Sequence, residues 1–432
     1  MSRFYSVKIV SLLWFGSVLG AACAFLTQVL LARGLGPAGL GSFVSALGIV
    51  TMLAPLASFG MGGFWLKVFG QEGWRAIRWV RSSFKYTLAT TFLVLTASLT
   101  WALLGPNDAS TRDLLVVLST FLLGQVAIEL VSAKLQLEER YLALTLWQFL
   151  PHLLRLLLVS MLVLVMANVM TPWSVAFAYA LISLGIFILG TFYIRRLYCG
   201  QLNLKGHGEL SASNNQPTLP TSIRQVAAQS WPFGLAGVFY LIYFQSDIIL
   251  LKYIDGDKSA GIYNSAFAIM AAVYLLPSVI YQKFLLPKIH RWAHCDRDRF
   301  YQVYRAGNWM MLKLGLLSML AIWLLASWGV QFFFGDSYIG AVLPLSILSL
   351  GVPIRFVAIN VGSSLVTQEH MRRKVWFMAV TAFLNVALNI IFIPKYGMSG
   401  AAVATVISDI LLLFLYLYSA NYHVFTKREV VC

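Results

Sequence analysis

The stretch VKIVSLLWFGSVLGAACAFLTQVLL, Val7–Leu31, decides the fold class of this chain. It is an almost continuous apolar run, whereas a strand of a soluble sheet typically has about 5–6 residues. A helix needs roughly 20 apolar residues to cross the hydrocarbon core of a bilayer. The run therefore predicts a membrane-spanning helix at the start of the chain.

The glycines that follow this run, Gly34, Gly36 and Gly39, have the spacing G-x-G-x-x-G of dinucleotide-binding folds. That motif holds a pyrophosphate only when a strand precedes it, a helix opens at its last glycine and an acidic residue follows about 20 residues later. Here a membrane-length segment precedes the glycines instead. We therefore expect them to form a tight turn at the outer face, between the first and second helices.

The composition of the whole chain is that of a membrane protein. Of its 432 residues, 59% are hydrophobic and 11% are charged, and the mean hydropathy is +0.77. Soluble domains have about 45–50% apolar and about 25% charged residues. Apolar segments of membrane length recur throughout, and they predict an all-α membrane protein with twelve transmembrane helices at residues 8–32, 40–64, 86–104, 114–133, 144–167, 172–194, 226–251, 262–285, 309–333, 339–366, 375–393 and 399–421.

The 32 basic residues predict the orientation of the chain, because Lys and Arg in short loops accumulate on the cytoplasmic side. Most of them lie at the termini or in the loops after even-numbered helices. The opposite loops hold Arg33, Arg112, Lys252, Lys258 and Lys395. Both termini are therefore expected in the cytoplasm. This topology and anionic lipid account for most of the net charge of +16, so no nucleic-acid partner is expected.

The longest hydrophilic stretch divides the chain into two halves. Residues 195–225 are polar and rich in Ser, Asn and Pro, which is typical of a flexible linker. They predict a six-helix lobe at 1–194, a cytoplasmic linker at 195–225 and a second six-helix lobe at 226–432. An offset of 220 residues aligns the halves and pairs Gly41 with Gly261. This favours a parallel internal repeat, with chance similarity between two apolar segments as the alternative.

Charged residues inside the first six predicted helices are candidate functional residues. A charge at the bilayer centre costs at least about 2.5–3.5 kcal/mol and is tolerated mainly beside a cavity or a partner. Gln148, His152 and Arg155 share one helix face at i, i+4 and i+7. We interpret this face as a cationic strip facing water, with an internal structural pair as the alternative. Glu129, close to Lys134, is expected to reach the inner membrane interface.

Three further groups lie inside the predicted helices of the second half. Arg355 and Asp409 lie near the middle of their helices, either as functional residues or as a pair that neutralises itself. Asp247 lies in the outer third of its helix, as a proton or ion site or as a structural residue. Asn385 and Asn389 share a helix face, where hydrogen bonding between helices is the simpler interpretation.

The sequence does not indicate an enzyme. It contains no Walker loop, zinc-protease helix or paired carboxylates on an aqueous domain, and no extramembrane segment is long enough to hold an active site. The four cysteines are scattered without the spacing of metal ligands. We therefore expect neither a metal site nor a cofactor.

Three stretches resemble the bacterial polysaccharide flippases of the multidrug/oligosaccharidyl-lipid/polysaccharide exporter (MOP) superfamily: LARGLGPAGLGSF, SDIILLKYIDGDKSAGIYNSA and LNVALNIIFIPKYGMSGAAVATVIS. The likeness covers both halves and nearly the full length. It implies two six-helix lobes around a central cavity that opens alternately to each side of the bacterial inner membrane. Members of the family flip sugar units linked to undecaprenyl pyrophosphate during O-antigen, lipopolysaccharide, capsule or exopolysaccharide biosynthesis.

The resemblance also implies roles for residues inside the membrane. Arginine binds a pyrophosphate through two parallel hydrogen bonds. The candidates for substrate binding are therefore the arginines Arg155, Arg355 and Arg33, together with His152 and Gln148 beside Arg155. Asp247 and Asp409 are candidates for coupling transport to protons or sodium, and no motif decides the ion. The expected partners are lipid-linked oligosaccharide and membrane lipids, together with a polysaccharide polymerase and glycosyltransferases.

Two other functions remain open from the sequence. A drug exporter of the same superfamily would favour an acidic, aromatic cavity over a cationic one. A membrane enzyme that polymerises sugars would need a large outer catalytic loop, and the predicted outer loops are all short. The sequence does not identify the sugars, the pathway or the oligomeric state.

Overall fold

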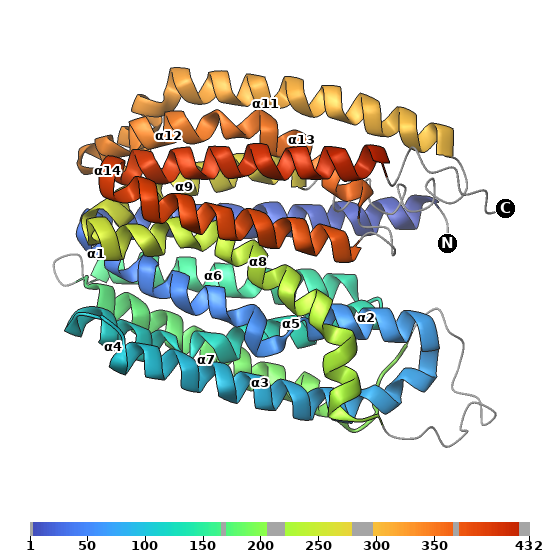
Figure 1. Ribbon diagram of the computed structural model, residues 1–432. Helices are drawn as coiled ribbons and strands as arrows, with labels where there is room; N and C mark the ends of the chain where they lie inside the picture. The colour runs from blue at the N-terminus through green and yellow to red at the C-terminus, as the bar shows by residue number, and fades with distance from the viewer. Residues whose placement is uncertain (1–2, 166–169, 205–220, 279–296, 366–370, 423–432) are drawn as a thin grey trace. The chain divides into compact units, whose positions relative to one another are not determined.

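All regular secondary structure in the described part of the computed structural model is helical, which confirms the predicted all-α class (Figure 1). The described residues are 3–165, 170–204, 221–278, 297–365 and 371–422. Their helices are α1 (Arg3–Ser58), α2 (Met61–Glu72), η1 (Gly73–Ala76), α3 (Ile77–Leu104), α4 (Ala109–Leu118), α5 (Phe121–Leu137), α6 (Tyr141–Val165), α7 (Pro172–Tyr198), α8 (Ile223–Asp255), α9 (Asp257–Ser278), α11 (Arg297–Phe334), η4 (Asp336–Ala341), α12 (Val342–Ser349), α13 (Gly351–Ser364) and α14 (Met371–Ser419).

Many of these helices belong to segments that are long and apolar enough to cross a membrane. Among the described residues there are seven such segments, or eight if the bent pair Asp336–Ser349 and Gly351–Ser364 forms one span. The multi-pass membrane architecture is therefore confirmed, and the expected count of twelve is only roughly matched. The count is lower because Ser11–Leu104 and Arg373–Tyr422 each enter it as one continuous segment, and because the expected span 262–285 lies partly outside the described residues.

Glycines break the two longest helices. Inside α1, Gly36 has φ 66° and ψ 175°, and inside α14, Gly397 has φ 55° and ψ −134°. A positive φ costs glycine little because it has no Cβ, so the chain can change direction there without strain. The turn predicted at Gly34–Gly39 is thereby confirmed at Gly36.

The chain divides into two compact units whose boundaries differ from a simple cut between halves. The first comprises Met1–Thr27 and Ala46–Leu241, and the second comprises Gln28–Ser45 and Ile242–Cys432. In the first unit, α5 packs against α2, α6 and α7, and α4 packs against α3 and α7. In the second, α11 packs against α12 and α13, and α14 packs against α9, α12 and α13. The middle of the predicted linker, residues 205–220, lies outside the described part of the chain.

The segment 28–45 joins the second unit through contacts at backbone level. A Cβ atom on Gly41 would overlap the carbonyl oxygen of Asp257, and one on Gly261 would overlap the carbonyl oxygen of Pro37. The two contacts are related by the same offset of 220 residues that aligns the halves of the sequence. This reciprocity supports the internal repeat, and it explains why glycine stands at both positions.

Candidate functional site

A carboxylate on α8 is the centre of a buried polar cluster in the second unit. The side chain of Asp247 accepts hydrogen bonds from the Tyr263 hydroxyl at 2.8 Å, the Asn389 amide at 2.7 Å and the Thr405 hydroxyl. The residue is 2% exposed. Among the described residues no basic side chain forms an ion pair with it, so hydrogen bonds alone stabilise a charge at this position.

Two asparagines extend this cluster along one face of α14. Asn389 donates to the backbone oxygen of Asn385 at 3.0 Å, and Ser246 donates to the Asn385 side-chain oxygen at 2.8 Å. The side-chain oxygen of Asn389 is buried and accepts no hydrogen bond from the described residues. Carboxylate, hydroxyl and amide oxygens converge here, and this is a donor set that suits a proton or a hard cation.

The second buried carboxylate of this unit belongs to an ion pair. Nη1 of Arg355 on α13 lies 3.0 Å from Oδ1 of Asp409 on α14, and the Tyr243 hydroxyl donates to the same oxygen at 2.7 Å. The Arg355 guanidinium also lies over the Tyr243 and Phe244 rings, 4.8 and 5.0 Å from their centroids. The structure thus brings together Arg355 and Asp409, and it adds a partner, Tyr243, that the sequence did not indicate.

Arg155 in the first unit has aromatic neighbours and no carboxylate partner among the described residues. Its guanidinium lies over Phe121 of α5 and Tyr179 of α7, at 4.9 and 5.0 Å from the ring centroids. Its Nε is buried and has no hydrogen-bond partner in the described part of the chain. A charge held by rings alone keeps its hydrogen-bonding capacity for another group.

The other residues of the predicted strip have different surroundings. His152 lies near Gly20 of α1, and Gln148 reaches the Ser132 hydroxyl of α5 at 3.5 Å. The predicted cationic strip therefore has an exposed amide, Gln148, at one end and a half-buried arginine, Arg155, at the other.

Arg33 binds the end of a helix in the second unit. Its Nε donates to the carbonyl oxygen of Phe333 at 2.8 Å, and its Nη2 donates to that of Phe332. These carbonyls lie in the last turn of α11, where a helix leaves acceptors without intrahelical partners. A cation there is also stabilised by the helix dipole.

The first unit contains a cavity of about 450 Å³ with one polar wall. Its polar wall comes from α1, α5 and α6 and consists of Thr51, Gln125, Glu129, Ser132, Gln136 and Gln148. The carboxylate of Glu129 accepts from the backbone N–H of Gly62 at 3.1 Å and from the Ser58 hydroxyl. Lys134 pairs with Glu138 at 2.7 Å, and the expected position of Glu129 at the inner membrane interface stays a prediction.

Sequence reasoning overlooked most of this wall, although the sequence contains a usable signal. Gln125, Glu129, Ser132 and Gln136 follow the spacing i, i+4, i+7 and i+11, so they form one polar face on an apolar helix. The partners Tyr263 and Thr405 of Asp247 carry no comparable signal, because they come from separate helices.

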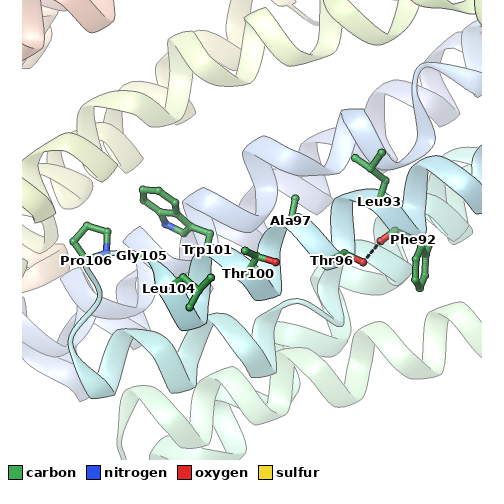
Figure 2. A pocket seen from close by; sticks show the side chains of 9 residues that line it. All are labelled: Phe92, Leu93, Thr96, Ala97, Thr100, Trp101, Leu104, Gly105 and Pro106. Atoms are coloured by element: carbon green, nitrogen blue, oxygen red, sulfur yellow. Dashed lines mark hydrogen bonds between the residues drawn. The ribbon is translucent and has the colours of Figure 1, made fainter.

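A second hollow lies along α3 and has the character of a lipid-facing surface. Figure 2 shows most of its residues on consecutive turns of that helix, with Gly105 and Pro106 just after its end. The Thr96 hydroxyl donates to the Phe92 carbonyl of the same helix, 2.9 Å away. Phe92 and Leu104 are 71% and 82% exposed. Large apolar side chains exposed on a membrane helix face hydrocarbon, so we assign no ligand to this hollow.

Comparison with solved structures places the fold among known transporters. The chain is similar to the lipid II flippase MurJ in an inward closed conformation, with 15% identity, a TM-score of 0.73, and coverage of 95% of this chain and 87% of that one. It is also similar to a MOP superfamily transporter from Pyrococcus furiosus, with 12% identity, a TM-score of 0.59, and coverage of 96% and 95%. It is similar as well to the MATE multidrug transporter DinF-BH, with 16% identity, a TM-score of 0.61, and coverage of 98% of this chain and 96% of that one.

Comparison with protein families is more specific. A search among curated protein sequences gave no match. Residues 6–292, which are more than half of the chain, match the family described as polysaccharide biosynthesis protein. The chain therefore belongs to the polysaccharide biosynthesis protein family and has the fold of the MOP superfamily.

Proposed function

We propose that the protein is a flippase that moves oligosaccharide linked to undecaprenyl pyrophosphate across the bacterial inner membrane, for polysaccharide or O-antigen biosynthesis. The observation that carries this proposal is an arginine inside a membrane helix of each unit, Arg155 and Arg355, each lying over aromatic rings. A planar guanidinium matches a pyrophosphate better than an ammonium does. Membership of a polysaccharide biosynthesis family supports the same class of substrate.

Asp409 would regulate the availability of Arg355. A bound pyrophosphate and the Asp409 carboxylate compete for the same guanidinium, since both accept its N–H groups. Protonation of Asp409 would remove its charge and release Arg355 for the headgroup. In this mechanism, transport is coupled to protons at the ion pair.

Asp247 would bind the second coupling ion, a proton or sodium. Its carboxylate is surrounded by hydroxyl and amide groups, and the unpartnered oxygen of Asn389 supplies a further ligand for a cation. Binding of a cation changes the net charge of a buried cluster, and this shifts the equilibrium between inward-open and outward-open states if the two states bind it differently. We also propose that both termini lie in the cytoplasm, as the distribution of Lys and Arg among the loops predicts.

The alternative is a multidrug exporter, which the likeness to DinF-BH favours. Purified protein in liposomes distinguishes the two, with the lipid-linked oligosaccharide of the source cells or rhodamine 6G as cargo. We expect the lipid to become accessible to an external lectin, at a rate that depends on an imposed pH or sodium gradient. Export of the dye without movement of the lipid would contradict the flippase proposal.

A further inference from the structure

The cavity of the first unit takes no part in the proposed binding of the pyrophosphate. Its residues Gln125, Glu129, Ser132 and Gln136 lie on one face of α5, within a segment apolar enough to cross a membrane. Polar side chains inside a membrane are costly unless they face a cavity or a partner. A face of four polar residues is therefore expected to line this cavity rather than to face lipid.

The side-chain amides of this cavity are available for a ligand. Gln125 and Gln136 form no hydrogen bond with any residue in the described ranges, and Gln148 has only its 3.5 Å contact with Ser132. Each amide carries two donors and an acceptor, so it can bind a hydroxyl group in either sense. Glu129 differs from them, because Ser58 and the N–H of Gly62 already hold its carboxylate.

The rest of the cavity is small or apolar. Gly60, Gly62, Gly63 and Gly237 contribute to its lining, and the ring of Phe233 lies against Gly63. A Cβ on Gly60 or Gly63 would overlap Phe233 or Gly234, so glycine at these positions lets α8 pack closely against α2. An aromatic ring offers a flat surface for the carbon-bound face of a sugar ring, and few polar groups among apolar ones are typical of small-molecule sites.

The charge and the length of the cavity define the ligand class. None of the described residues that line it is Lys, Arg or His, and Glu129 is acidic, so the cavity is unsuited to a phosphate. Gln136 lies eleven positions after Gln125, which is about 16 Å along a helix at about 1.5 Å per residue. The volume of about 450 Å³ is typical of a site for a small organic ligand.

We propose that this cavity binds the uncharged, hydroxyl-rich sugar chain of the substrate through the amides of Gln125, Gln136 and Gln148, with Phe233 beneath a sugar ring. This inference rests on the proposed flippase function. It separates two tasks: arginines bind the pyrophosphate, and the amides of the first unit recognise the sugars. Glu129 is a positioning residue that holds the start of α2 against α5.

The test compares two lipids that differ only in the sugar. Detergent-purified protein is titrated with undecaprenyl pyrophosphate and with the same lipid carrying the oligosaccharide isolated from the source cells. Gln125→Leu combined with Gln136→Leu should weaken binding of the glycosylated lipid by about tenfold, because at least two hydrogen bonds are lost. Its affinity for the bare lipid should be unchanged.

Controls keep the result interpretable. Gln331→Leu makes the same exchange on α11 of the second unit, outside the cavity, and should change neither affinity. Gln148→Leu alters an exposed side chain, so it tests the cavity even if the double variant fails to fold. If the double variant loses the same affinity for both lipids, or loses none, the proposed sugar site is wrong and the flippase proposal is unaffected. A wild-type protein that binds both lipids equally would also overturn the sugar site, and one that binds neither overturns the flippase proposal as well.

Discussion

Arg355 and Asp409 form an ion pair with 3.0 Å between Nη1 and Oδ1, and the aromatic rings of Tyr243 and Phe244 cover the guanidinium. The Arg355 side chain is 11% exposed and that of Asp409 is 2% exposed. Removing one partner of a buried pair leaves an uncompensated charge and is strongly destabilising. Loss of function in a single variant would therefore not separate a structural role from a role in binding.

Exchanging the two residues separates these roles. Arg355→Asp combined with Asp409→Arg restores opposite charges but moves the guanidinium to another helix. We expect the double variant to be inserted at normal levels and to remain inactive in polysaccharide export, because the headgroup needs the guanidinium at position 355. Export is measured by immunoblot of the polysaccharide in cells that contain the variant at the wild-type protein level. Recovery of export would show that the pair is only structural.

Asp247→Asn should slow transport while preserving the shape of the side chain. Coupling free energies between two ligands typically correspond to about 5–150-fold, so a loss of this size is expected in a gradient-driven liposome assay. The dependence on the gradient should weaken as well, because the amide cannot bind a proton or act as an anionic ligand, while Asp409 still couples transport to protons. Asp113→Asn, at an exposed surface ion pair, serves as the control. Unchanged transport over a series of pH and sodium values would make Asp247 structural.

The membrane fold could be predicted from the sequence because its signal is local. Apolar segments of bilayer length identify the helices, and the glycines of the first turn coincide with the break at Gly36. The division into units could not be predicted in the same way. Residues 28–45 precede the first half's other helices in sequence, yet contacts with Asp257 and Gly261 place them in the second unit.

The candidate site was only partly accessible to sequence reasoning. Charges such as Asp247 and Arg355 stand out because they are rare in membrane helices. The partners that determine their chemistry do not stand out, since Tyr243 and Tyr263 are ordinary aromatic residues until the helices pack. Lys134 is close to Glu129 in sequence but pairs with Glu138 in space, and Ser58 and Gly62 are the partners of Glu129.

Gly261→Ala should destabilise the contact between residues 28–45 and the rest of the second unit. The added methyl group would overlap the carbonyl oxygen of Pro37, and backbone cannot move aside as a flexible side chain can. Overpacking of this kind costs about 1–3 kcal/mol, and we expect a lower melting temperature by differential scanning fluorimetry. Gly329→Ala is the matched control, because its Cβ meets nothing within 4 Å. An equal effect of the two substitutions would contradict the packing argument.

Substitutions of Arg155 test whether its guanidinium, which lies over the rings of Phe121 and Tyr179, binds the substrate. Arg155→Lys keeps the charge but loses the planar group that lies over Phe121 and Tyr179, so partial activity is expected. Arg155→Met fills similar space without charge, and losing a charge-assisted hydrogen bond worth about 1.5–3 kcal/mol should weaken binding of undecaprenyl pyrophosphate by about 10–150-fold. Arg112→Lys, at an exposed position, should bind normally. If the methionine variant keeps wild-type affinity and transport, Arg155 serves only to pack α6 against its neighbours.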